Sequence, residues 1–75
     1  MNKASEIIVR DVAVMNGKPI IKGTRITVEL ILKKLSEGAT IDALLDLYPH
    51  ITMKQILATI EYAASVISNE ELLDV

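Results

Sequence analysis

The chain has 75 residues, of which 51% are apolar, only two are aromatic and none is cysteine. This length suits one small domain, and the lack of cysteine excludes a disulfide framework or a cysteine-based zinc site. The net charge of −2 is unevenly divided, because residues 1–27 sum to +3 and residues 28–75 to −5. With a pI near 5.2, the chain as a whole is not a general nucleic-acid binder.

Residues 1–27 are expected to form a basic β arm. Their β-branched runs predict short strands near residues 6–10 and 19–22, with a turn at Asn16-Gly17 between them. The two strands either form a hairpin within one chain or pair with the same arm of a second subunit, since a lone hairpin is barely stable in water. We favour the homodimer and expect its contacts to come from five apolar residues, Ile7, Ile8, Val9, Ile20 and Ile21.

Residues 28–68 are expected to form a homeodomain-like three-helix bundle. Thr27 is the predicted N-cap of the first helix, which Gly38 ends in a left-handed conformation. Thr40 caps the second helix, and Pro49 stops it. Four residues then lead to the third helix, a spacing typical of a helix-turn-helix but also of other helix pairs in bundles.

The third helix begins with a predicted capping box, in which Thr52 and Gln55 satisfy each other's backbone amides. Helical spacing predicts one core-facing stripe on it: Met53, Ile56, Leu57, Ile60, Ala63, Ala64 and Ile67. We expect this helix to end near Ser68 or Asn69, which leaves residues 69–75 as an acidic tail of a single domain that spans residues 1–75.

The chain resembles the domain-of-unknown-function family 433 (DUF433) over roughly residues 7–67. The resemblance rests on Gly-Lys-Pro-Ile-Ile-Lys-Gly-Thr-Arg-Ile-Thr-Val at residues 17–28, Tyr-Pro-His-Ile-Thr at residues 48–52, and single positions at Gly38, Ile56, Ala58, Ala63 and Ala64. It implies a homeodomain-like fold with a short β element. It also implies a small bacterial or archaeal antitoxin, often encoded beside a PIN-like nuclease, that neutralises the nuclease and binds its own promoter.

Three cations of the arm, Lys18, Lys22 and Arg25, are candidate phosphate contacts, because basic side chains that neutralise DNA phosphates release counterions. Solvated charges that protect an edge strand from aggregation are the alternative for all three. Arg25 has a further alternative, which is a structural ion pair with a carboxylate of the bundle.

Lys54 and Gln55, at the start of the third helix, are candidate base-reading residues, since lysine can read guanine and glutamine can read adenine. Against this reading, Asp42 and Asp46 on the preceding helix would repel phosphates. A helix-turn-helix shape used only for packing is therefore an equal alternative.

The acidic tail supplies the candidate partner-binding residues Leu72, Leu73 and Val75, which lie among three carboxylates. Such a peptide suits a basic groove, for example that of an RNA-cleaving nuclease. A disordered terminus is the alternative.

The sequence offers no nucleophile–base pair, no phosphate-cradling loop and no metal-ligand set beyond the single histidine, His50, which we assign to the linker. We therefore expect a cytoplasmic protein that is not an enzyme and that has no cofactor, small-molecule substrate or membrane partner. The leading hypothesis is a dimeric, DNA-binding antitoxin. The alternatives are a dimeric interaction module without nucleic-acid binding and a stand-alone helix-turn-helix regulator.

Overall fold

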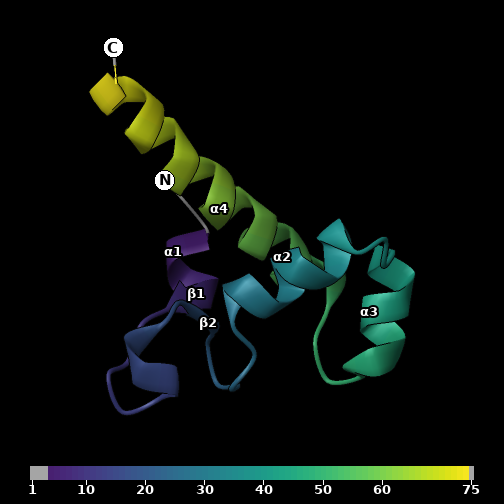
Figure 1. The fold of residues 1–75 in the computed structure, drawn as a ribbon. Helices are drawn as coiled ribbons and strands as arrows, with labels where there is room; N and C mark the ends of the chain where they lie inside the picture. Colours follow the sequence, from purple (N-terminus) through teal and green to yellow (C-terminus); the bar gives the residue numbers. More distant parts are fainter. Residues whose placement is uncertain (1–3, 75) are drawn as a thin grey trace.

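The computed structural model describes residues 4–74, in which a small β element precedes three longer helices (Figure 1). In chain order the elements are α1 (Ala4–Ile7), β1 (Ile8–Val9), a 3-10 turn (Met15–Gly17), β2 (Ile20–Ile21), α2 (Val28–Ser36), α3 (Ile41–Leu47) and α4 (Met53–Asp74). The predicted class is confirmed, because the described chain is mainly helical and its three longer helices follow a two-stranded antiparallel sheet.

The two strands pair within one chain, with Ile8 opposite Ile21 and Val9 opposite Ile20. The segment that leads into α2 lies along the other side of β2, where the amide of Ile21 donates to the carbonyl of Ile26 at 2.9 Å. The first strand is shorter than predicted, because residues 6 and 7 belong to α1. In this helical turn the Ile7 side chain packs against the core.

The predicted helix starts are confirmed. The hydroxyl oxygens of Thr27 and Thr40 each accept a hydrogen bond from the amide three residues further on, at 3.0 and 3.1 Å. In the capping box, the backbone amide of Gln55 donates to Thr52 Oγ1 at 3.2 Å, and the backbone amide of Thr52 donates to the side-chain oxygen Oε1 of Gln55 at 2.8 Å. Gly38 adopts a φ of +101° just after α2, as a left-handed helix end requires.

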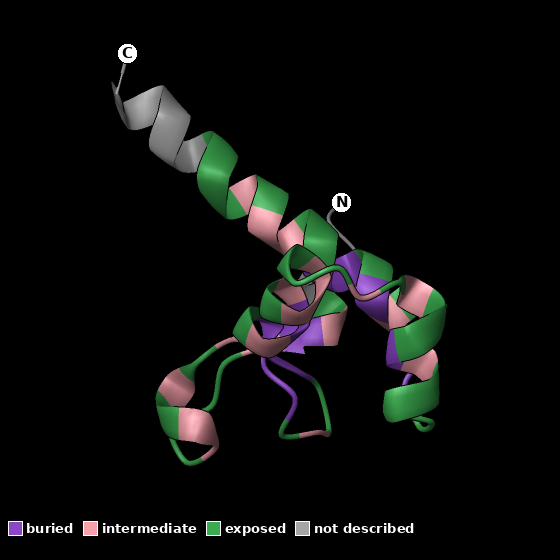
Figure 2. Cartoon of the chain, turned by 45° about the vertical axis from the view of Figure 1, so that its right-hand side comes forward, coloured by how far each residue is buried: buried purple, intermediate pink, exposed green. Residues whose placement is uncertain are grey.

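The core lies where the β element, α2, α3 and the first turns of α4 meet, and it is almost wholly aliphatic (Figure 2). Its buried apolar members are Ile8, Ile21, Ile26, Val28, Ile31, Leu44, Ile51 and Ile56. The hydroxyl of Thr59 is also fully buried, and it donates to the carbonyl of Gln55 at 3.0 Å. Beyond Thr59, none of the described side chains of α4 is buried.

The extent of α4 and the direction of its apolar residues differ from the prediction. The helix continues to Asp74 instead of ending near residue 68, so its 22 residues span about 33 Å. The nine residues of α2 and seven of α3 are too few to cover that length, and α4 projects past them (Figure 1).

The predicted core stripe of α4 is consequently split. Ile56 is fully buried, and Ala63 is half-buried. The other five members, which we call the outer stripe, are exposed: Met53, Leu57, Ile60, Ala64 and Ile67. Helical periodicity placed all seven on one broad apolar arc, but only one edge of that arc meets the rest of the chain.

Candidate binding surfaces

Two loops of the β element form one end of the molecule, which we call the loop end, comprising residues 10–19 and 22–25 (Figure 1). Short-range hydrogen bonds shape both loops. Asp11 accepts from the amide of Ala13 through its carboxylate at 2.9 Å, and the Thr24 hydroxyl donates to the carbonyl of Ile21 at 2.8 Å. Gly23 supplies a φ of +81° in the second loop, which a side chain would disfavour.

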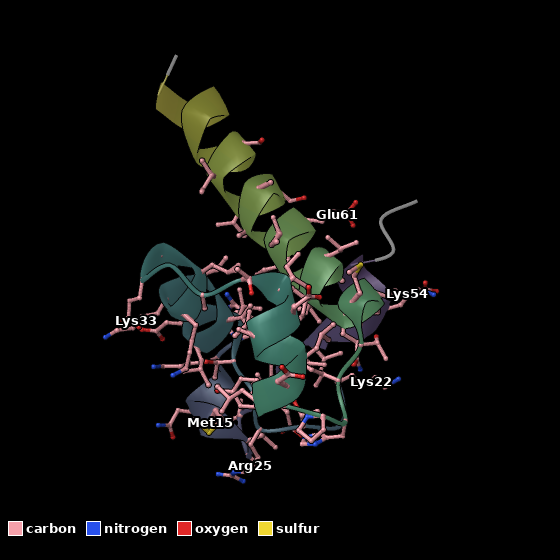
Figure 3. The ribbon with its side chains drawn as sticks, turned by 90° about the vertical axis from the view of Figure 1, so that its right-hand side faces the viewer. Met15, Lys22, Arg25, Lys33, Lys54 and Glu61 are labelled. Atoms are coloured by element: carbon pink, nitrogen blue, oxygen red, sulfur yellow. The ribbon has the colours of Figure 1, made fainter. Side chains whose placement is uncertain are left out.

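Of the three arm cations, Lys22 and Arg25 are both exposed on the second loop. The two line one open hollow between the loops together with Asp11, which is the only acidic residue among the described residues that line it. The Arg25 guanidinium contacts Met15 Sδ at 3.8 Å, so a side-chain contact joins the two loops (Figure 3).

Lys18 is engaged differently from the other two. Its Nζ donates to Glu29 Oε1 on α2 at 3.0 Å, and this is the one ion pair within 4.0 Å among the described residues. The hydrogen bond and the lysine charge lower the pKa of Glu29. The structural ion pair that the sequence suggested for Arg25 is thus formed by Lys18, which pairs with Glu29 across the fold.

The start of α4 offers little polar surface for reading bases. Lys54 is exposed, but Gln55 is half-buried, and its amide oxygen is used by the capping box. The exposed positions around Lys54 belong largely to the apolar outer stripe. Asp42 and Asp46 are exposed on α3, as expected. The structure therefore places Lys22 and Arg25 on one loop, with their side chains projecting in different directions (Figure 3), and leaves the two helix candidates on another element.

The five candidate dimerisation residues lie mostly inside the protomer. Ile8, Ile20 and Ile21 are buried, and Ile7 and Val9 are half-buried. The four isoleucines belong to the core of the same chain or pack against it, so the larger exposed apolar surface lies elsewhere. The tail candidates fall outside what the structure describes. Val75 is not among the described residues, and the side chains of Leu72 and Leu73 are not described.

The sequence did not reveal an apolar groove of about 380 Å³ between α2 and α4. Leu32 lines it from α2, and Tyr62 and Val66 line it from α4. Val66 lies outside the stripe that periodicity singled out. The proximity of α2 to this part of α4 depends on tertiary packing, and no local pattern signals it.

Among the side chains that the structure describes, no three acidic or histidine residues are grouped as a metal site. His50 lies exposed in the linker between α3 and α4. No described helix is long and apolar enough to cross a membrane.

A comparison with curated proteins and with solved structures finds no match. Residues 8–63, which run from β1 into α4 and include the loop end, match the family described as "Protein of unknown function (DUF433)". The chain belongs to this DUF433 family.

Proposed function

We propose that this protein is an antitoxin-like binding protein that contacts promoter DNA through the loop end and neutralises a PIN-like nuclease. The observation that carries the DNA contact is the exposed pair Lys22 and Arg25, which lies on one loop without a carboxylate within 4.0 Å among the described residues. Membership of the DUF433 family supports the antitoxin assignment through the resemblance given above.

The loop end suits DNA because Lys22 and Arg25 can contact a phosphate without first breaking an ion pair. The planar guanidinium of an exposed arginine can bind a phosphate through two hydrogen bonds. The carboxylate of Asp11, which lines the same hollow, has the opposite charge and would repel a phosphate. Phosphate contacts of this kind position a protein on DNA without reading its sequence.

For the nuclease, the proposal assigns the acidic carboxyl-terminal residues 70–75 to the partner's basic groove. The segment carries three carboxylates among three apolar residues, a composition that combines charge attraction with burial of apolar surface. Removal of residues 70–75 should then weaken the complex with a co-expressed nuclease. Unchanged affinity would exclude this role for the tail.

The DNA contact is tested by titrating the protein with the DNA upstream of its gene at several salt concentrations. Removing the two cations in Lys22→Gln/Arg25→Gln should weaken binding and reduce the salt slope by about 2, one for each phosphate that the variant no longer neutralises. Lys33→Gln/Lys34→Gln makes the same change in net charge on α2 and should leave the slope unchanged. Equal effects of the two double variants would show that only net charge matters.

The interaction module without nucleic-acid binding remains the second candidate, because the exposed outer stripe of α4 is apolar surface of a kind that protein partners cover. The titration separates the two candidates, since this module binds no upstream DNA even at low salt. A stand-alone regulator would bind the DNA but would not inhibit the nuclease.

A further inference from the structure

The outer stripe has the spacing of a coiled-coil contact surface. Its members Met53, Leu57, Ile60, Ala64 and Ile67 follow one another at intervals of four, three, four and three residues. This heptad pattern keeps the side chains on one line along a helix, where they can enter the holes of a second helix with the same pattern. Ala64 is small, so it allows close approach of the two helix backbones.

Nothing in the described chain covers this line. Leu57 is 50% exposed and Met53 48%, whereas the buried residues Ile56 and Thr59 point into the core from a different side of α4. A helix laid along the outer stripe would therefore meet α4 away from the core of its own protomer.

The charges beside the outer stripe favour a second copy of this chain in antiparallel orientation. Lys54 and Glu61 are exposed, lie one heptad apart and project from the same side of α4 (Figure 3). When two α4 helices run antiparallel with their twofold axis between residues 58 and 59, Met53 faces the second copy's Ala64, and Leu57 faces its Ile60. Lys54 then lies within about 3 Å, along the helix axis, of Glu61 in the second copy, and the same pair forms twice by symmetry.

A parallel pair lacks this match. Parallel helices would bring Lys54 and Glu61 beside the positions of Ile56 and Ala63, which are buried and half-buried against their own protomer. The charged flank would then have no partner of opposite sign.

We propose that α4 is the homodimer interface of this protein, in which two copies pack antiparallel through the outer stripe and exchange two Lys54–Glu61 ion pairs. This placement moves the interface away from the β arm, whose isoleucines are used by the protomer core. It also gives a small cysteine-free domain the additional buried apolar surface that such a domain needs. The loop end is not part of the interface.

The first test measures molecular mass by sedimentation over a concentration series. Leu57→Gln alters both central layers of the dimer, because Leu57 of each copy faces Ile60 of the other, and it should raise the dimer dissociation constant at least about ten-fold. Val12→Gln is the matched control, because Val12 is an 86% exposed apolar residue outside the stripe. A monomeric wild type throughout the series, or equal dissociation constants for the two variants, would overturn the proposal. Circular dichroism is used to check that both variants remain folded.

The second test uses charge reversal. Lys54→Glu and Glu61→Lys should each weaken self-association, because each places like charges opposite one another. A mixture of the two variants should form a heterodimer, and the double variant Lys54→Glu/Glu61→Lys should regain wild-type association. Failure of both rescues would contradict the pairing.

The orientation is tested by introducing cysteine into a chain that has none. Met53→Cys mixed with Ala64→Cys should yield a disulfide-linked heterodimer on mild oxidation, whereas Met53→Cys alone should crosslink poorly. Efficient crosslinking of Met53→Cys with itself would show a parallel pair and overturn the antiparallel arrangement.

Discussion

Replacement of Ile21 by alanine tests whether the β arm builds the protomer core. Ile21 is fully buried at the centre of the arm, paired with Ile8 on one side and with residue 26 on the other. The substitution removes three buried carbons, worth about 2.4 kcal/mol in transfer free energy. A residual cavity of about 50 Å³ adds about 1.2 kcal/mol, so the free energy of unfolding should fall by about 2.5–4 kcal/mol. A domain of this length has about 4–11 kcal/mol in total, so the loss is a large fraction of it.

The assay is urea unfolding followed by circular dichroism, with all variants at one protein concentration because self-association changes apparent stability. Ile21→Val should cost only about 0.5–1.5 kcal/mol. Val12→Ala, at an exposed position, should cost almost nothing. If Ile21 served a dimer contact instead, Ile21→Ala would give a folded monomer of nearly normal stability, and that result would refute the assignment.

Three further predictions concern single residues. Thr27→Ala removes the cap of α2 and should cost about 1 kcal/mol in urea unfolding, whereas Thr27→Ser should retain most of it. Gly38→Ala forces a side chain into a φ of +101° and should destabilise by about 1–2 kcal/mol, with Gly38→Asn less costly; equal stability of all three proteins would contradict the left-handed helix end. Lys18→Ala should raise the pKa of Glu29 toward its ordinary value in an NMR titration. Because the folded-state pKa is lowered, the pair's small contribution to stability is present above the ordinary carboxylate pKa and is lost as pH falls through the lowered value; an unchanged Glu29 pKa would contradict the pair.

The sequence predicted well those features whose causes are local. The caps at Thr27, Thr40 and Thr52 depend on a side chain and an amide only three residues apart, and the structure contains all three. The same holds for the left-handed Gly38, because the signal is a glycine directly after the helix and its hydrogen bonds reach only three to five residues back. Such local signals do not depend on the tertiary packing of the rest of the chain.

Features that depend on a distant neighbour were not predictable in the same way. Lys18 and Glu29 lie eleven residues apart, and the fold of the intervening loop determines that they meet. Periodicity grouped Leu57 with Ile56, although one is half exposed and the other is buried. A hydrophobic pattern shows that a side chain favours burial, but it does not show whether its own chain or another molecule supplies the cover.

The same distinction applies to the candidate DNA contacts. The sequence indicated Lys18, Lys22 and Arg25 as candidate phosphate contacts, but not which of them are free of an ion pair. The structure separates Lys18, which is paired, from Lys22 and Arg25, which are not paired within the described chain. It also shows that the amide oxygen of Gln55 belongs to a helix cap.

The most direct test of the proposed DNA contact is an NMR titration of isotope-labelled protein with the DNA upstream of its gene. We predict that the backbone amide signals of the non-proline residues of the loop end shift most, that Lys22→Gln/Arg25→Gln strongly reduces these shifts, and that signals from residues 53–61 of α4 change little. Shifts centred on residues 53–61 would contradict the loop-end contact and restore α4 as the recognition helix.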